Sequence, residues 1–314
     1  MKLSLFILIL SVFLVSTGCT VEPNNQNAPR VSATPAPSPA SSVETAKATP
    51  TAAPSPEMLP GPNAIPQDTR VVVNIPAYRM DIFQDGSLIK TYKVGIGYPE
   101  FPLPTGLRTA DTVIFNPTWT VPDESWAAEM KNVSVGETVE AGDKNNPLGV
   151  IKIPIGLPSL IHGGKAPAKI GKFASHGCVG LTDKQIKDFA MHLAHVANTE
   201  INDQQVTSYL SERKRTREVK LDEEIPVELR YETIVLEDGK LHIYKDVYDQ
   251  KTNTEENLRS VLTAHGVDFE TLPAAQKTQL LNALKSVSKK NEAVVQLASA
   301  QKGYPAAVEL DSGR

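Results

Sequence analysis

The sequence predicts a mostly β domain followed by a small α-helical extension at its C-terminal end. Three observations carry this prediction. Short β-branched, apolar segments recur over residues 70–162 and again over residues 225–244. Glycine and proline separate these segments throughout. Helical periodicity is concentrated in one segment at residues 182–193 and in residues 254–299. The 314-residue chain is long enough for one or two domains.

The beginning of the chain has the pattern of an export signal. Lys2 supplies a positive start, and the mainly apolar run of residues 3–15 is too short to span a bilayer as a helix. Small residues then precede Cys19 in an arrangement that resembles a bacterial lipobox, with Ser16 where a leucine is usual. We expect residues 1–19 to be a signal peptide with lipid on Cys19. An ordinary cleaved signal with an incidental cysteine is the alternative.

Residues 20–66 are predicted to be a disordered linker. Many of the chain's 24 prolines lie before residue 67, and stretches such as Ala33–Ala40 contain only Ala, Thr, Pro and Ser. Such a composition cannot bury enough apolar surface to offset the entropy of ordering. An extended, polyproline-like form of this length would reach about 140 Å at ~3.1 Å per residue. A lipid-anchored domain could therefore search the neighbouring cell wall.

The folded domain is predicted to begin at residue 67 with short strands. Its first segment, Val71–Ile75, is β-branched and apolar, and Pro76 ends it. A strand, a turn and a second strand follow over residues 79–94, with Asp85-Gly86 as the turn signal. Further short strands are expected at residues 112–115, 149–153 and 160–162.

One helix is predicted inside this β-rich region. It spans residues 182–193, with Thr182 as its N-cap and an apolar face formed by Ile186, Phe189, Ala190 and Leu193. The following residues, 197–224, are highly charged. We interpret them as an insertion made of a solvated helix or loop.

The end of the chain is predicted to contain the last strands and then helices. Strands resume at residues 225–231, and a hairpin with Asp238-Gly239 as its turn follows over residues 233–244. These strands complete a domain that we place at residues 67–249. Amphipathic helices are expected in the remaining residues, 250–314, because leucine and valine recur there at helical spacing.

Charge and cysteine content restrict the function classes. The formal net charge of −4 gives no indication of nucleic-acid binding. The chain has two cysteines, Cys19 and Cys178. If Cys19 carries lipid, Cys178 is the one thiol of an exported protein, where an idle thiol risks oxidation and mispairing. This thiol is therefore a candidate functional group.

The residues around Cys178 match the requirements of a thiol nucleophile. A thiol reacts as a thiolate, so it needs a base or a positive field, and His162 and His176 are candidates. Gly177 allows close backbone approach, and the helix expected from Thr182 favours a thiolate modestly. From the residues alone, a buried structural cysteine stays an alternative. A metal site is less well supported, because zinc usually needs three or four ligands.

Four sequence motifs, in order along the chain, resemble the L,D-transpeptidase catalytic domain, the YkuD family. The active-site motif of that family is a His, a spacer, Ser/Thr-His-Gly-Cys, a hydrophobic residue and usually Asn or Arg. The matching segments are Phe101–Gly106, Asn116–Pro122, His162 with Ser175–Val179, and Asp238–Tyr248. The resemblance covers about residues 68–249. Two positions depart from the family: Gly164 replaces a common Thr, and Gly180 stands where Asn or Arg is usual.

The resemblance implies a fold, an activity and roles for the motif residues. The fold is a β-sandwich of mixed sheets with an active-site helix. Cys178 is the nucleophile and His162 its base, oriented by the carbonyl of Gly163. The backbone amides of Gly177 and Cys178 hold the oxyanion. His176 shapes the site, as does Ser175, and an exchange of roles between the two histidines stays open.

The resemblance also implies substrates, partners and location. Donor and acceptor are peptidoglycan stem peptides, joined through a thioester into a cross-link in cell-wall biogenesis, with no cofactor or metal. Alternatives are water as acceptor, giving an L,D-carboxypeptidase, an envelope lipoprotein as acceptor, giving a wall-anchoring enzyme, and a non-catalytic peptidoglycan-binding domain. The expected location is the periplasmic side of the cell envelope, with membrane attachment through lipid on Cys19.

Overall fold

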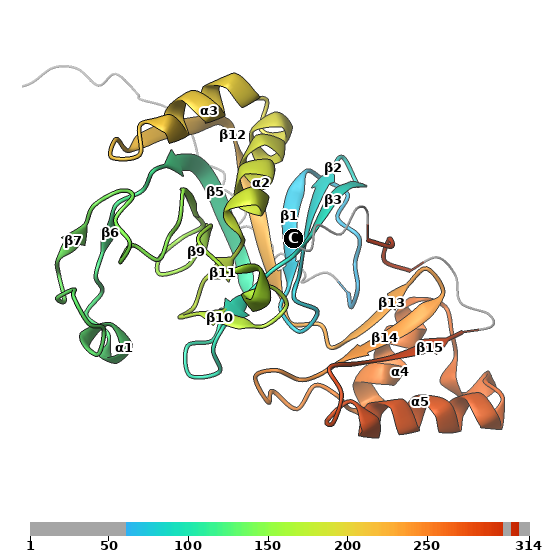
Figure 1. Ribbon diagram of the computed structural model, residues 1–314. Helices are drawn as coiled ribbons and strands as arrows, with labels where there is room; N and C mark the ends of the chain where they lie inside the picture. Colours follow the sequence, from blue (N-terminus) through green and yellow to red (C-terminus); the bar gives the residue numbers. More distant parts are fainter. Residues whose placement is uncertain (1–60, 298–302, 308–314) are drawn as a thin grey trace, which may run out of the picture. The chain divides into compact units, whose positions relative to one another are not determined.

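The computed structural model describes residues 61–297 and 303–307 (Figure 1). Cys19, the predicted signal peptide and nearly all of the predicted linker lie outside the described residues. Within the described part, no helix combines the length and the apolar character needed to cross a membrane.

A mixed eight-stranded sheet forms the centre of the described structure (Figure 1). Its strands, in spatial order, are β11 (Val179–Gly180), β9 (Leu160–His162), β8 (Ile151–Pro154), β5 (Gly106–Phe115), β12 (Arg217–Arg230), β1 (Arg70–Asn74), β2 (Arg79–Gln84) and β3 (Ser87–Lys93). The pairs β1–β12 and β9–β11 are parallel, and the other neighbours are antiparallel. The prediction of a mostly β fold with mixed sheets is confirmed.

The helix α2 (Asp183–Val196) packs on this sheet, as the periodicity predicts. Thr182 and Gln185 form a capping box, in which each side chain accepts a hydrogen bond from the other residue's backbone amide, at 3.2 and 3.0 Å. The apolar face includes Phe189, whose ring meets the ring of Tyr92 edge-on at 5.6 Å. The cap residue Thr182, four residues after Cys178, fixes where the helix begins.

Short elements complete the domain around one end of the sheet. The strands β4 (Ile96–Gly97) and β10 (Phe173–Ser175) pair in parallel, and η1 (Pro167–Lys169) is a short 3-10 turn. A small lobe at residues 119–148 contains β6 (Trp119–Thr120), α1 (Ser125–Ala128) and β7 (Thr138–Val139). The lobe has a small apolar cluster of its own, made of Trp119, Val121, Ala127, Val139 and Leu148.

The charged stretch at residues 197–224 differs from its prediction as a solvated helix or loop. Its first half contains α3 (Asp203–Ser211), but from Arg217 it is already part of β12, which pairs with β5. Val206 and Leu221 from this stretch are buried in the main core. Alternation explains the difference, because charged residues dominate the composition while Val219 and Leu221, two positions apart, pack toward the core.

The hairpin at residues 233–244 also differs from its predicted place. Its strands β13 (Ile234–Glu237) and β14 (Lys240–Tyr244) pair with β15 (Glu292–Gln296), outside the main sheet. The helices α4 (Glu255–Ala264) and α5 (Ala274–Ser286) and the 3-10 turn η2 (Phe269–Thr271) contribute to the same apolar core (Figure 1). The C-terminal unit is therefore α/β, and its core begins at Ile234 and not at residue 250.

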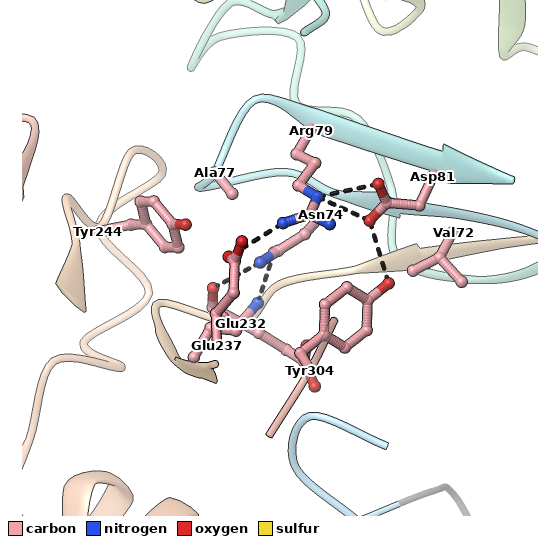
Figure 2. A pocket seen from close by; sticks show the side chains of 10 residues that line it. Val72, Asn74, Ala77, Arg79, Asp81, Glu232, Glu237, Tyr244 and Tyr304 are labelled. Atoms are coloured by element: carbon pink, nitrogen blue, oxygen red, sulfur yellow. Dashed lines mark hydrogen bonds and ion pairs between the residues drawn. The ribbon is translucent and has the colours of Figure 1, made fainter. Parts of the chain in front are cut away.

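A buried polar cluster connects β2 to this C-terminal unit (Figure 2). The guanidinium of Arg79 contacts the carboxylate of Asp81 at 2.8 Å and that of Glu237 at 3.0 Å. Its second terminal nitrogen donates to the carbonyl of Pro305 at 3.1 Å, and Tyr304 donates from its hydroxyl to Asp81 at 3.1 Å. The space left among these side chains is about 10 Å³, scarcely enough for one water molecule, so the cluster is a structural contact.

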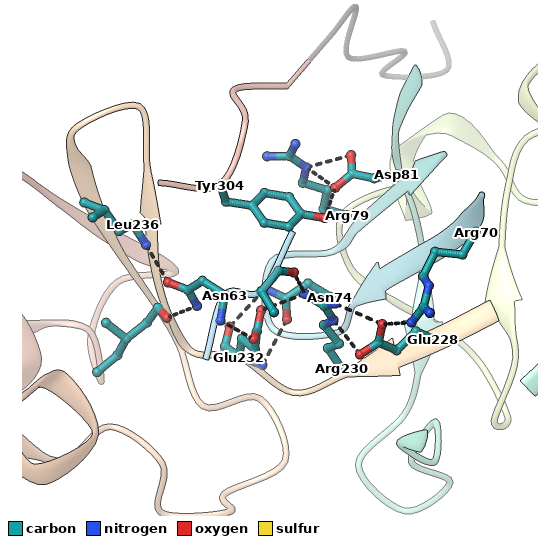
Figure 3. Close-up of polar contacts among 12 residues, drawn as sticks. Asn63, Arg70, Asn74, Arg79, Asp81, Glu228, Arg230, Glu232, Leu236 and Tyr304 are labelled. Carbon is teal, nitrogen blue, oxygen red and sulfur yellow. Dashed lines mark hydrogen bonds and ion pairs between the residues drawn. The ribbon is translucent and has the colours of Figure 1, made fainter. Parts of the chain in front are cut away.

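The start of the described chain reaches the same region (Figure 3). Asn63 donates from its side-chain amide to the carbonyl of Ile234 and accepts from the amide of Leu236, at 3.0 and 2.9 Å. Its own backbone amide donates to Glu232 at 2.8 Å. Residues far apart in the sequence are thus held together where the main sheet leads into the C-terminal unit.

Replacement of Arg79 by methionine is expected to lower the free energy of unfolding by about 3–5 kcal/mol. Arg79 is 8% exposed and Asp81 only 2%, so the change leaves buried carboxylates without their cation. Chemical denaturation of the purified protein measures the effect. The matched control is Arg215→Met at an exposed ion pair with Glu212, for which we expect a change within about 0.5 kcal/mol. Equal effects in the two variants would contradict this role of Arg79.

Candidate active site

Two neighbouring strands bring the predicted site residues together. β9 ends with His162, and β11 begins immediately after Cys178. The two strands are parallel, with Val179 opposite Ile161 and Gly180 opposite His162. The backbone of Leu160, at the start of β9, lies close enough to the Cys178 thiol to lower its pKa. The pairing of two short strands therefore sets the cysteine beside the strand that carries the histidine.

A tight turn over residues 175–178 presents the thiol. The hydroxyl of Ser175 donates to the carbonyl of Cys178 at 2.6 Å and accepts from the amide of Cys178 at 3.1 Å. Gly177 has a φ of +90°, a backbone conformation that residues other than glycine rarely adopt. Its carbonyl accepts a hydrogen bond from the hydroxyl of Ser159 at 3.0 Å. Ser175 and Gly177 thus have clear structural roles in shaping the turn.

This geometry changes the predicted oxyanion donors. The amide of Cys178 is occupied by the Ser175 hydroxyl, so it is not free for a substrate oxygen. Within the described residues, no hydrogen bond engages the amide of Gly177. The amide of Gly177 is consequently the better placed of the two predicted donors.

His162 is held in one orientation in a buried position. Its side chain is 3% exposed, and Nδ1 lies 2.8 Å from the carbonyl oxygen of Gly163. A carbonyl only accepts, so Nδ1 carries the proton and Nε2 is the basic nitrogen. Burial and the charge of Lys165 lower the pKa of His162 to about 3, although carbonyls of Gly163 and Leu148 oppose the shift. The imidazole is therefore neutral at neutral pH.

The glycines after His162 fit into a crowded backbone region. A Cβ on Gly163 would lie 2.6 Å from the carboxylate of Asp183. Gly164 has φ of +77°, and a Cβ there would lie 2.8 Å from the amide nitrogen of Gly149. The amide of Gly164 donates to the Asp183 carboxylate at 2.8 Å. The departure from the family's Thr at position 164 thus has a local reason, since a threonine would be strained there.

The Cys178 thiol is neutral in the resting site. Burial raises its pKa, while the polar backbone of Leu160 and the positive charge of Lys165 act in the opposite direction. Since the neighbouring imidazole is also neutral, the resting pair is thiol and imidazole, and Lys165 is the cation that acts on both. Lys165 could not be found from the sequence, because a lysine three residues after a histidine matches no motif.

His176 has a different environment from His162. It is exposed, and its ring stacks on Trp126 of the 119–148 lobe, with centroids 4.0 Å apart and planes 2° from parallel. Phe101 and Tyr98 contact the same ring, at centroid distances of 5.0 and 5.3 Å. This packing favours a role in shaping the site entrance. Trp126 could not be found from sequence spacing, because the lobe reaches the site only through the fold.

Within residues 61–297 and 303–307, no cluster of three or more His, Cys, Asp or Glu side chains has the arrangement of a metal site. The candidate site thus brings together the Cys178 thiol, the oriented neutral imidazole of His162, the backbone amide of Gly177 and the ammonium of Lys165. Residues 68–206, which include all of these groups, match the family model of the YkuD L,D-transpeptidase catalytic domain. Residues 68–206 form a YkuD-family catalytic domain.

Curated relatives of the L,D-transpeptidase domain agree with this assignment. One is the probable L,D-transpeptidase ErfK/SrfK of Escherichia coli K12, 31% identical over 120 residues. Another is the probable L,D-transpeptidase YcfS of the same organism, 33% identical over 125 residues. Each match covers 37% of this chain and 38% of the relative. The chain thus aligns with well under half the length of the curated relatives that it matches.

A solved structure is also similar to the L,D-transpeptidase domain. The NMR structure of the catalytic domain of the E. faecium L,D-transpeptidase matches 53% of this chain and 100% of its own, with 17% identity and a TM-score of 0.33. This likeness is too weak to add to the family match.

Proposed function

We propose that this protein is a cell-wall L,D-transpeptidase that cross-links peptidoglycan stem peptides through a thioester on Cys178. The observation that carries the proposal is the pairing of β9 with β11, which sets Cys178 beside the strand of His162, while the carbonyl of Gly163 fixes that imidazole with Nε2 as its basic nitrogen. The family of residues 68–206 supports the reaction class.

The first half-reaction forms the acyl-enzyme. The thiol proton of Cys178 moves to Nε2 of His162 as sulfur attacks the amide carbon between the third residue of a stem tetrapeptide and its terminal D-Ala. The amide of Gly177 donates to the oxyanion that develops on the carbonyl. When the C–N bond breaks, His162 returns the proton to the leaving amine. Free D-Ala departs and a thioester remains on Cys178.

The second half-reaction consumes the thioester. An amine of a neighbouring stem peptide attacks the thioester carbon, and His162 takes up the proton that this amine loses. The C–S bond then breaks, and the proton passes to the sulfur of Cys178. The product is an amide cross-link, and the enzyme returns to its neutral thiol and imidazole.

Products identify the acceptor and thereby test the proposal. The purified protein is incubated with tetrapeptide muropeptides, and the products are identified by mass spectrometry. We expect cross-linked dimers with release of one D-Ala per bond formed. Tripeptides alone would indicate a carboxypeptidase, and products seen only with an added envelope lipoprotein would indicate wall anchoring. No conversion of the tetrapeptide would favour a non-catalytic peptidoglycan-binding domain.

We also propose that the enzyme is exported and tethered to the membrane on the periplasmic side through lipid on Cys19. The support is the short apolar run that ends at Cys19, followed by the Pro/Ala/Ser-rich linker. Replacement of Cys19 by alanine is expected to move the protein from the membrane fraction to the soluble fraction, because one lipid-bearing residue supplies the attachment. Unchanged fractionation of the variant in immunoblots would count against lipidation.

A further inference from the structure

Lys165 is a cation without a carboxylate partner beside the thiol. Its side chain is partly buried, and its charge acts on Cys178, His162 and His176. Within the described residues, no ion pair or side-chain hydrogen bond engages it. An unpaired ammonium in such a position is costly unless the protein uses its charge.

The Lys165 side chain occupies the space over Gly180. A Cβ added to Gly180 would lie 2.8 Å from Cγ of Lys165 and 2.9 Å from its Cε. Gly180 has no left-handed backbone conformation that would require glycine. The reason for glycine at this position is therefore the room that the lysine stem takes.

The backbone on both sides of this contact is fixed. Gly180 exchanges two backbone hydrogen bonds of 2.8 Å with Gly95, and the amide of Lys165 donates to the carbonyl of Leu181 at 3.0 Å. The backbone cannot move away from the Lys165–Gly180 contact without breaking these hydrogen bonds. A larger residue at position 180 must consequently displace the Lys165 side chain.

Other charged groups around the thiol do not replace this cation. His162 is neutral, and the pKa of His176 is also lowered, by partial desolvation against its aromatic neighbours and then by the charge of Lys165. Lys169 lies farther along the chain and acts on Lys165. The carboxylate of Asp183 accepts the amides of Gly164 and Val150, at 2.8 and 3.3 Å.

We propose that Lys165, seated in the space that Gly180 leaves open, is the cationic positioning residue that stabilises the thiolate of Cys178. Its ammonium keeps all three protons while the thiol proton passes to His162 or to water. As an activating charge for acyl transfer, this role rests on the function proposed above.

The pH dependence of thiol alkylation tests the proposal without a muropeptide substrate. In this reaction the thiolate of Cys178 attacks iodoacetamide, a C–S bond forms and iodide leaves. The rate at Cys178 is followed from pH 5 to 10 by peptide mass spectrometry of the full chain, which separates it from Cys19. The variants are Lys165→Met, which keeps the stem and removes the charge, Lys165→Arg, which keeps the charge, and Gly180→Ala, which displaces the stem.

The expected result separates charge from structure. In Lys165→Met the midpoint of the alkylation profile rises by about one pH unit or more, so the rate at a fixed lower pH falls about tenfold. Lys165→Arg keeps the wild-type midpoint, and Gly180→Ala shifts it upward, as Lys165→Met does. A merely structural lysine would not give this pattern. In that case Lys165→Met, which removes the charge, and Gly180→Ala, which displaces it, would not both raise the midpoint.

Two outcomes overturn the proposal. One is a Lys165→Met profile that superimposes on that of the wild type. The other is a Lys165→Arg profile that shifts like Lys165→Met, which would mean that the amine and not the positive charge matters. Should the midpoint depend on Lys165 as expected while tetrapeptides are not converted, the charge assignment stands and only the transpeptidase function fails.

Discussion

Replacement of Cys178 by serine is expected to abolish formation of cross-linked muropeptides, with a loss of at least about 1,000-fold. A hydroxyl is a much weaker acid than a thiol and its neutral form is a poor nucleophile, so the base that takes the thiol proton does not activate serine to the same extent. The fold is expected to survive, because serine is slightly smaller than cysteine and still fits the 175–178 turn. Product analysis by mass spectrometry measures the loss, and thermal unfolding checks the fold.

Full activity in a correctly folded Cys178→Ser protein would remove the nucleophile assignment. The matched control is Ser134→Ala on the 119–148 lobe, a serine that contacts Glu137 through its backbone amide. This variant is expected to retain wild-type turnover. A parallel loss in the control would indicate a general effect of substitution and not chemistry at residue 178.

Replacement of His162 by alanine is expected to reduce turnover by about 100- to 10,000-fold, the range for loss of a general acid–base. His176→Ala is expected to retain part of the activity, because His176 is exposed and stacks on Trp126. The initial rate of D-Ala release measures both effects. His192→Ala on α2 serves as the control, since this histidine bonds to Asp188 of its own helix.

The order of these two losses identifies the base. A larger loss in His176→Ala than in His162→Ala would show that His176 takes the thiol proton. Because the buried His162 also supports local packing, His162→Ala is compared with His162→Asn, which keeps part of the volume and polarity. If His162→Asn were as active as the wild type, the general-base role of His162 would be wrong.

Local sequence patterns predicted the elements whose signals lie within a few residues. The hairpin at Asp85-Gly86 and the N-cap at Thr182 depend on neighbours in the chain, and both form at the expected residues. The motif residues His162 and Ser175–Val179 likewise come together through adjacent strands. These features follow from short-range geometry.

Features that depend on long-range packing were missed or misplaced. The strand at residues 217–224 was not predicted because most of its residues are charged. Its inward-facing residues can be identified only from its pairing with β5. Nothing in the sequence of the hairpin at residues 233–244 indicates that it pairs with β15. Lys165 and Gly180 are 15 positions apart in the chain. The Lys165 side chain fills the space that a side chain at position 180 would need, and such a steric contact between distant residues cannot be recognised in a single sequence.

The central claim, that Cys178 forms an acyl-enzyme in this site, is tested most directly by intact-protein mass spectrometry after incubation with a carbapenem. The strained β-lactam carbonyl acylates a thiolate, the ring C–N bond breaks and the ring nitrogen takes up a proton, so the whole drug mass is added as a thioester. We predict one adduct on the wild-type protein, mapping to Cys178 and absent from Cys178→Ser. An unmodified wild-type protein that also leaves tetrapeptides unconverted would contradict the account and favour a non-catalytic binding domain.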